Sequence, residues 1–349
     1  GLSSPSGAWH CPSQASEVPA SMWGSRSAVN SVRQPLHAGS WYDGEASKLR
    51  AEVQRLLGAE YAEGVTRDSG MKAAIVPHAG LRFSGSVAAG VYARLDVGIV
   101  RRIFLLGPSH HAYVDGIGLP GEAVTAYRTP LGDLCLDKPV LDELRRSGHF
   151  STLPMDVDEA EHSIELQLPF LAELLLHSPL RGGQQPATLI PMLVGQVSPA
   201  DEVRYGQLLA PHLEAEGSVF IISSDFCHWG AQFGYTRKGS PALAQTYRDG
   251  PRPENAEIEG LDREGMALIA QQSSSGFREY LKREANTICG RHPILVLLEI
   301  LRASRNELRV DFLKYAQSSA MPGMPPPSKS SVSYACACCW PGPILASAA

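Results

Sequence analysis

Residues that can bind metal ions or transfer protons follow three apolar runs of this chain, at the point where each run ends. They are His78 after residues 72–77, His110 and His111 after residues 101–109, and Asp225, Cys227 and His228 after residues 218–224. In open α/β sheets, ligands bind beyond the carboxyl ends of the strands, because the loops there converge. We therefore expect these side chains to share one cleft, although they lie far apart in the sequence.

Two further stretches carry groups of the same kind. Residues 159–170 place Glu161, His162 and Glu165 in the first turns of an expected helix. Residues 286–294 place Cys289 and His292 at the junction of a loop and another helix, and Cys289 with Gly290 is expected to form a small exposed turn. Imidazole is a good ligand for Fe(II), copper and zinc, and sulfur shifts the preference toward softer ions. A cysteine must lose its proton to bind a metal. Histidine and cysteine residues in one cleft would therefore be suitable metal ligands.

Each of these residues also has a purely structural interpretation. A histidine at the end of a strand can be a hydrogen-bonding turn residue, and Cys289 can be a buried thiol. Asp225 and His37 can cap turns, and His162 can form a hydrogen bond at the entry of its helix. Because three strands end in the same way, a shared metal site and a purely structural role are about equally well supported. Both interpretations stay open at this point.

The elements that must position these groups can be predicted from hydrophobic periodicity and from turn residues. Expected strands cover 72–77, 101–107, 187–195, 218–230 and 308–317, and expected helices cover 84–95, 158–176, 199–215, 254–272, 276–285 and 293–303. Pro169 is expected to kink or split the helix over 158–176. Alternating strands and helices predict an α/β fold with a central, largely parallel mixed sheet flanked by helices.

Residues 34–335 contain no stretch with the composition of a linker, so we expect a single domain there. Residues 1–33 begin with a stretch rich in serine, proline and alanine and are expected to form a disordered extension. Residues 336–349 show no assignable periodicity and are expected to form a divergent tail.

Composition excludes several classes of protein. The net charge of −5, without a basic cluster, argues against nucleic-acid binding and against a polybasic membrane patch. No apolar stretch approaches the length of a transmembrane helix. The seven cysteines have no disulfide-framework spacing, which favours a reducing compartment, and we expect the cytoplasm. Organellar targeting by the N-terminal extension is a less supported alternative, because arginine is sparse there.

Several motifs, taken together and in this order, resemble the Memo family (mediator of ErbB2-driven cell motility) over residues 36–335. They are HAGSWY (37–42), PHAG (77–80), RRIFLLGPSHH (101–111), YRTPLGDL (127–134), DEAEHSIELQLPF (158–170), SSDFCHWG (223–230), NTICGRHPI (286–294) and YAQSS (315–319). The resemblance implies a fold like that of the class III extradiol (LigB-type) dioxygenases, with a central sheet flanked by helices.

The resemblance also implies a set of site residues. His78, His110 and Cys289 would be the metal ligands, and Asp225 and His228 would lie beside the metal. The metal would be copper or iron, with redox activity, whereas animal members of the family also act as signalling adaptors for phosphotyrosine peptides. Ring-cleaving dioxygenase activity does not follow, because a thiolate replaces the carboxylate ligand of those enzymes.

Three functions remain open. The first is an iron- or copper-dependent oxidoreductase in which Asp225 assists and His228 shuttles a proton. The second is a non-catalytic metal-binding or adaptor protein whose cleft takes a small molecule or a peptide. The third is a zinc-dependent hydrolase. In each case we expect the remaining histidines of these motifs to line the same cleft, namely His37, His111, His162 and His292.

Overall fold

The structure is a computed structural model of the whole chain, and it describes residues 31–177, 185–239, 253–320 and 330–342. The strands are β1 (Ser31–Arg33), β2 (Ala73–Val76), β3 (Arg102–Pro108), β4 (Ile117–Leu119), β5 (Val124–Thr129), β6 (Gly132–Cys135), β7 (Phe150–Thr152), β8 (Thr188–Val194), β9 (Ser218–Ser223), β10 (His228–Gly230), β11 (Leu308–Gln317) and β12 (Ser330–Pro341). The helices are α1 (Ala46–Ala62), α2 (Leu81–Tyr92), α3 (Lys138–Arg146), α4 (Met155–Ala160), α5 (His162–Glu165), α6 (Leu168–His177), α7 (Pro199–Glu214), α8 (Pro253–Ala270), α9 (Ser274–Glu284) and α10 (Arg291–Ala303).

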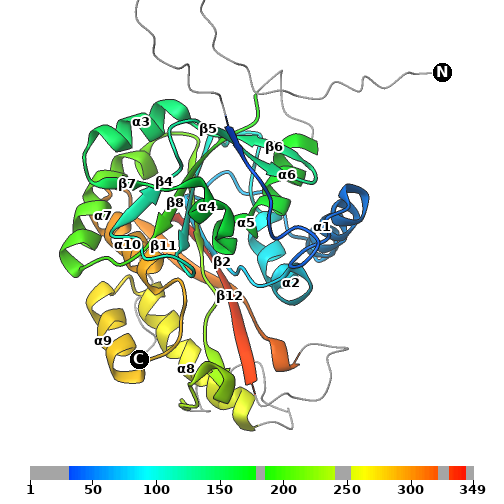
Figure 1. Cartoon of the computed structure of the whole chain (residues 1–349). Helices are drawn as coiled ribbons and strands as arrows, with labels where there is room; N and C mark the ends of the chain where they lie inside the picture. The colour runs from blue at the N-terminus through cyan, green and yellow to red at the C-terminus, as the bar shows by residue number, and fades with distance from the viewer. Residues whose placement is uncertain (1–30, 178–184, 240–252, 321–329, 343–349) are drawn as a thin grey trace, which may run out of the picture.

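A nine-stranded mixed sheet forms the centre of the molecule (Figure 1). Its order is β10-β12-β2-β9-β3-β8-β4-β7, and β11 pairs with β12. The central strands β2, β9, β3 and β8 are parallel, whereas β12 is antiparallel to β2 and β4 is antiparallel to β8. Helices pack on the sheet, among them α7 and α10 against β9 and α2 against β2. This confirms the predicted α/β fold, although the parallel part is smaller than we expected.

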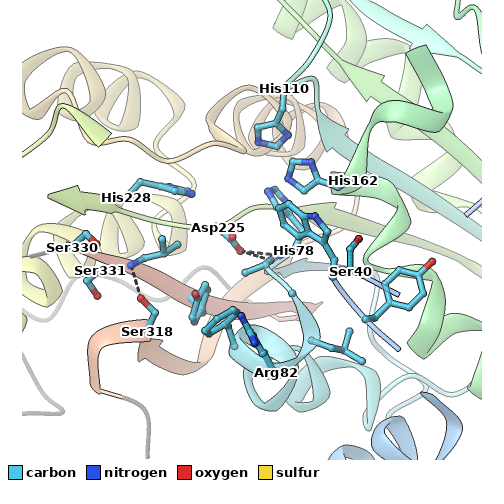
Figure 2. Close-up of a pocket in the computed structure, with 18 of the residues that line it drawn as sticks. Ser40, His78, Arg82, His110, His162, Asp225, His228, Ser318, Ser330 and Ser331 are labelled. Atoms are coloured by element: carbon cyan, nitrogen blue, oxygen red, sulfur yellow. Dashed lines mark hydrogen bonds between the residues drawn. The ribbon is translucent and has the colours of Figure 1, made fainter. Parts of the chain in front are cut away.

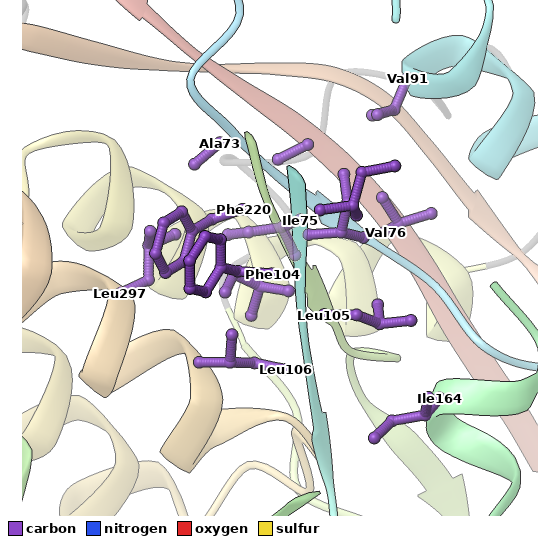
Figure 3. Packing of buried hydrophobic residues seen from close by; sticks show 14 of the residues in the cluster. Ala73, Ile75, Val76, Val91, Phe104, Leu105, Leu106, Ile164, Phe220 and Leu297 are labelled. Carbon is purple, nitrogen blue, oxygen red and sulfur yellow. The ribbon is translucent and has the colours of Figure 1, made fainter. Parts of the chain in front are cut away.

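The apolar runs of the central strands are buried on both faces of the sheet. Phe104 of β3 stacks on Phe220 of β9 with ring centroids 4.4 Å apart, on the side where Leu297 of α10 lies (Figure 3). The next residue, Leu105, points toward Ile164 of α5 on the other side, because successive strand residues face opposite ways (Figure 3). Because both faces of such a strand are covered, neighbouring residues on either face are apolar, and the sequence of the strand is continuously apolar.

The helix expected over residues 158–176 is instead divided into α4, α5 and α6. The first break falls at Glu161, whose backbone is extended (φ −87°, ψ 126°) and whose carboxylate accepts a hydrogen bond from Ser163 N–H. Pro169 lies in the first turn of α6, where no intrahelical bond needs its missing N–H. Similarly, the strand expected over 218–230 ends at Ser223 and resumes as β10.

Both expected boundaries of the domain lie elsewhere. Ser31–Arg33 form β1, which pairs with β5, and Arg33 is fully buried, so these residues are not part of a disordered extension. The expectation for residues 1–30 falls outside the described residues. Strand β12 continues through residue 336 to Pro341, and its cysteines are buried in the sheet. No helix among the described residues has the length and apolar composition needed to cross a membrane.

Removal of one ring of the stacked pair should destabilise the whole sheet. We expect Phe104→Ala to lower the free energy of unfolding by about 3–5 kcal/mol, because it removes buried area and leaves a cavity beside Phe220. Ile99→Ala, at a residue with 38% of its surface exposed, should change the stability by less than about 0.5 kcal/mol. Chemical denaturation of both variants measures the difference, and equal stabilities would contradict the assignment of this core.

Candidate metal centre

Three adjacent parallel strands deliver polar groups to the same edge of the sheet. His78 follows β2, His110 follows β3, and Asp225 follows β9, which lies between them. Figure 2 shows the rings of His78, His110 and His162 close together, with His228 across from them. Cys289 reaches the same place from the segment between α9 and α10. The structure therefore brings His78, His110, Asp225 and His228 together, whereas the expected Cys227 is fully buried and does not line the cavity in front of them.

Three donor atoms converge at this edge. His78 Nε2 lies 3.2 Å from Cys289 Sγ. One donor atom from each of His78, His110 and Cys289 can be chosen so that all three lie within 4.8 Å of one another. Metal–nitrogen and metal–sulfur bonds are about 2.0–2.3 Å long, so small shifts of these side chains would let a single ion touch all three donors.

Hydrogen bonds fix the orientation of the His78 ring. Its Nδ1 lies 2.7 Å from Ser223 Oγ, and the Ser223 hydroxyl donates its only proton to the carbonyl oxygen of Ser163 (2.6 Å). Nδ1 must therefore carry the ring proton, which leaves the Nε2 lone pair facing Cys289. Burial, followed by the nearby His110, His162 and His228, lowers the pKa of His78 well below its usual range. The ring is thus held neutral, which is the form that binds metals.

The ring of His110 is held in the same way by a carboxylate. Its Nδ1 lies 2.9 Å from Glu161 Oε1, and its backbone N–H donates to Glu161 Oε2 (2.6 Å). Burial opposes ionisation of Glu161, but the hydrogen bond and charge of His110 outweigh it and lower the pKa of Glu161 to about 2. When a metal-binding histidine donates the N–H of its other ring nitrogen to a carboxylate, that hydrogen bond orients the ring and raises the basicity of the ligand nitrogen.

Cys289 lies in the α9–α10 loop, where it packs against the β9–β10 loop, and it does not occupy the exposed turn that we expected. Its Sγ accepts a hydrogen bond from the backbone N–H of Asp225 (3.2 Å). The next residue, Gly290, is buried, and a Cβ added there would lie 2.3 Å from Cβ of Ser224. Burial, with the Asp225 carboxylate second, raises the pKa of the Cys289 thiol well above its usual range. A metal would therefore have to displace the thiol proton.

Asp225 and His228 lie beside these donors. Asp225 Oδ1 accepts hydrogen bonds from the backbone N–H groups of His78 (2.8 Å) and Ala79 (3.3 Å). His228 Nδ1 lies 3.0 Å from the carbonyl oxygen of Phe226 and 3.2 Å from that of Thr287. Nδ1 of His228 is therefore a donor to the backbone, and Nε2 is left for a ligand.

A cavity of about 850 Å³ opens in front of the donors. Its lining includes His78, His110, His162, Asp225 and His228, together with Trp41, Arg82, Phe83, Phe233 and serines of η4 (Ser318–Ala320) and β12. Its volume and its mixture of aromatic and polar groups are typical of a site for a small molecule.

The four other histidines that we expected in the cleft have different surroundings. His162 stacks between Trp41 and His110, with ring centroids 4.4 Å from each, and burial, then His110, lowers its pKa to about 3. His37 bonds Glu165 through Nδ1 (3.0 Å), and the exposed His111 has its ring 5.6 Å from that of His162. Both lie next to His162, outside the described cavity lining.

His292 lies in a separate pocket, so the expectation that it lines the cleft is wrong. It occupies the first turn of α10, and its Nδ1 is 3.7 Å from Glu202 Oε1 of α7. A residue three positions after Cys289, at the start of a helix, points toward the helix packed alongside it rather than back to the donors.

Sequence reasoning missed the buried network behind His110. Arg33 donates to Glu165 Oε2 (2.7 Å) and to the carbonyl oxygens of Asp158 (3.0 Å) and Glu161 (2.9 Å). It therefore holds the break between α4 and α5 that carries the Glu161 carboxylate. The acidic residues of this stretch were visible in the sequence, but they fitted an ordinary helix start, and nothing pointed to an arginine far from them in the chain.

Loss of the Arg33 guanidinium should strongly destabilise the folded protein. We expect Arg33→Met to lower the free energy of unfolding by about 3–5 kcal/mol, because it leaves the buried Glu165 carboxylate without its cation. The matched control is Arg128→Met, which breaks the exposed Arg128–Asp133 pair and should cost less than about 1 kcal/mol. Urea titrations of the two variants test this, and a small, equal loss in both would argue against the network.

Comparison with known proteins places this chain in a family. The family model described as "Memo-like protein" matches residues 33–338. Protein MEMO1 of Homo sapiens is 40% identical over 306 residues, which cover 87% of this chain and 95% of that protein. Protein MEMO1 of Xenopus laevis is 39% identical over the same share of each chain. A MEMO1 family protein of Schizosaccharomyces pombe is 34% identical over 324 residues, covering 88% and 98%. The chain therefore belongs to the Memo family.

Proposed function

We propose that this protein binds one redox-active metal ion, iron or copper, through His78, His110 and Cys289, and that it acts as an oxidoreductase. The observation that carries the proposal is the convergence of the three donor atoms within 4.8 Å. It is supported by the Nδ1 hydrogen bonds of both histidines, which leave each Nε2 free for an ion. The relation to extradiol dioxygenases stays a prediction from the resemblance.

The chemistry of the donors supports iron or copper over zinc. Two imidazoles and one thiolate suit copper best when it is Cu(I), and they also suit iron. A bound iron or copper ion would supply one-electron redox chemistry at this edge of the sheet. Three protein ligands would leave room for a fourth group from the cavity, as catalytic sites require. The free thiol of Cys289 needs a reducing compartment, which is why we place the protein in the cytoplasm.

In this proposal His228 is the acid or base. Its Nδ1 is occupied by backbone carbonyls, so Nε2 can exchange a proton with a molecule in the cavity. Asp225 positions the backbone of His78 and the sulfur of Cys289, because it bonds to both.

A binding role without chemistry is the second candidate. The cavity extends well past the donors to Trp41 and Phe233, which keep 38% and 37% of their surfaces exposed. Aromatic surface of this kind suits a bound small molecule or peptide. In an adaptor of this type the metal would stabilise the cleft, and its ligands would still be required.

Elemental analysis of anaerobically purified protein tests the metal site. We expect about one equivalent of iron or copper in the wild type and its loss in His110→Ala and Cys289→Ser, because each variant removes a donor. Glu161→Gln should keep the donors but weaken the affinity about 10–100-fold. His149→Ala, at an exposed histidine outside the site, is the matched control and should retain the metal.

The same preparations separate the candidates. Oxygen consumption by the metal-loaded wild type, lost in His228→Ala with its metal retained, would support an oxidoreductase. Metal binding without redox turnover would favour the adaptor. Zinc as the bound ion would favour a hydrolase. Unchanged metal content in His110→Ala would remove the proposed site.

The affinity for the metal should depend on pH. The Cys289 thiol is protonated in the metal-free protein, because burial and then Asp225 raise its pKa, whereas His78 stays neutral. Binding therefore releases the thiol proton, and the apparent affinity should rise by about tenfold per pH unit near neutrality. Calorimetric titrations in buffers of different ionisation enthalpy count the released protons. An affinity that does not change with pH would show that Cys289 is not a ligand.

A further inference from the structure

A further buried carboxylate, that of Asp262, lies behind the site and contacts none of the proposed metal ligands. Asp262 of α8 is fully buried. Its Oδ1 accepts hydrogen bonds from the backbone N–H of Cys227 (3.2 Å) and from Asn286 Nδ2 (3.0 Å). Its Oδ2 accepts one from the Tyr315 hydroxyl of β11 (2.9 Å). One carboxylate therefore joins the β9–β10 loop, the α9–α10 loop and an edge strand.

The two loops that Asp262 joins carry groups of the site. Cys227 directly precedes His228, and Asn286 lies three residues before Cys289. The loops are also bonded to each other, because Thr287 Oγ1 accepts from His228 N–H (2.7 Å) and donates to the His228 carbonyl oxygen (2.9 Å). A shift of one loop would therefore move both His228 and the Cys289 sulfur.

The surroundings of Asp262 are unusual for a structural carboxylate. Its hydrogen-bond donors Cys227, Asn286 and Tyr315 are neutral, and the nearby Arg263 is paired with Glu259 (2.9 Å). Burial raises the pKa of Asp262 to about 6, although hydrogen bonds from Asn286, Ser333, Tyr315 and Cys227 oppose this rise. An unpaired charge in the interior is costly. The carboxylate fixes the direction of two hydrogen-bond donors, Cys227 N–H on the β9–β10 loop and Asn286 Nδ2 on the α9–α10 loop.

We propose that Asp262 is a positioning residue of the metal centre. By fixing Cys227 and Asn286, it sets the place of the Cys289 sulfur relative to His78 and the place of His228 across the cavity. The inference rests on the metal centre proposed above. Without an acceptor at residue 262, the N–H of Cys227 and one N–H of Asn286 must find other partners, and both loops move to reach them.

Three variants test this proposal. Asp262→Leu keeps the approximate volume but removes the acceptor. Asp262→Asn keeps an oxygen for Cys227 and Asn286, because Tyr315 can turn its hydroxyl to Ser333 Oγ, 3.1 Å away, and accept from the amide. Glu259→Gln, at a fully buried carboxylate one turn earlier in α8, is the matched control, because Glu259 pairs with Arg263 of the same helix (2.9 Å).

The first measurement is hydrogen exchange in the metal-free proteins. We expect faster exchange of backbone amides in residues 225–230 and 286–291 of Asp262→Leu, and wild-type exchange of those segments in Asp262→Asn and Glu259→Gln. Because no metal is present, this result does not depend on the proposed function. Wild-type exchange of both segments in Asp262→Leu would overturn the inference.

The second measurement is titration with Co²⁺ under anaerobic conditions, read from the sulfur-to-cobalt absorption band. Asp262→Leu should bind about 10–100-fold more weakly with a shifted band, and Asp262→Asn should stay within a few-fold of the wild type. Equal losses in the Leu and Asn variants would overturn the proposal, because charge rather than hydrogen-bond direction would then matter. Absence of the band in the wild type would count against the metal centre itself.

Should Asp262→Leu fail to fold, Asn286→Ala provides the same test from the other side of the bond. It removes one donor, leaves the carboxylate with Cys227 and Tyr315, and also ends the bond from Asn286 to Tyr280 (2.7 Å). A weaker cobalt affinity with a shifted band is expected. Wild-type affinity together with a wild-type band would overturn the inference.

Discussion

The hydrogen bonds at Nδ1 of His78 and His110 are the constraint on which the site depends. Ser223, the last residue of β9, holds one ring, and Glu161, at the break between α4 and α5, holds the other. Both rings then present Nε2, and His78 Nε2 meets the Cys289 sulfur at 3.2 Å. The interrupted helix is therefore part of the site, because a continuous helix would keep Glu161 from turning to His110. Arg33 stabilises that interruption from behind.

The sheet serves as a rigid mount for these groups. Strands β2, β9 and β3 are adjacent, parallel and apolar on both faces, so packing fixes their ends and, with them, the residues that follow. The sulfur side of the site is supported differently, because Cys289 and His228 lie on loops. There the loops are held by hydrogen bonds of Asp225 with Cys289, of Thr287 with His228 and of Asp262 with Cys227.

The sequence predicted the parts of this structure that depend on local pattern. Continuous apolar runs revealed the central strands, and the histidines at their ends marked the cleft. The missing parts depend on partners that are distant in the chain. Arg33, Glu161 and Asp262 act through contacts that no spacing encodes. The helix periodicity of 158–176 was real, since its apolar residues are buried, but tertiary contacts at Glu161 overrode its continuity.

The most direct test of the central claim is a crystal structure of the metal-loaded protein, with anomalous diffraction measured at the absorption edge of the metal. Our account predicts one strong anomalous peak bonded to Nε2 of His78, Nε2 of His110 and Sγ of Cys289. A peak at the alternative group of His110, Glu161 and His162, or no peak near Cys289, would contradict it.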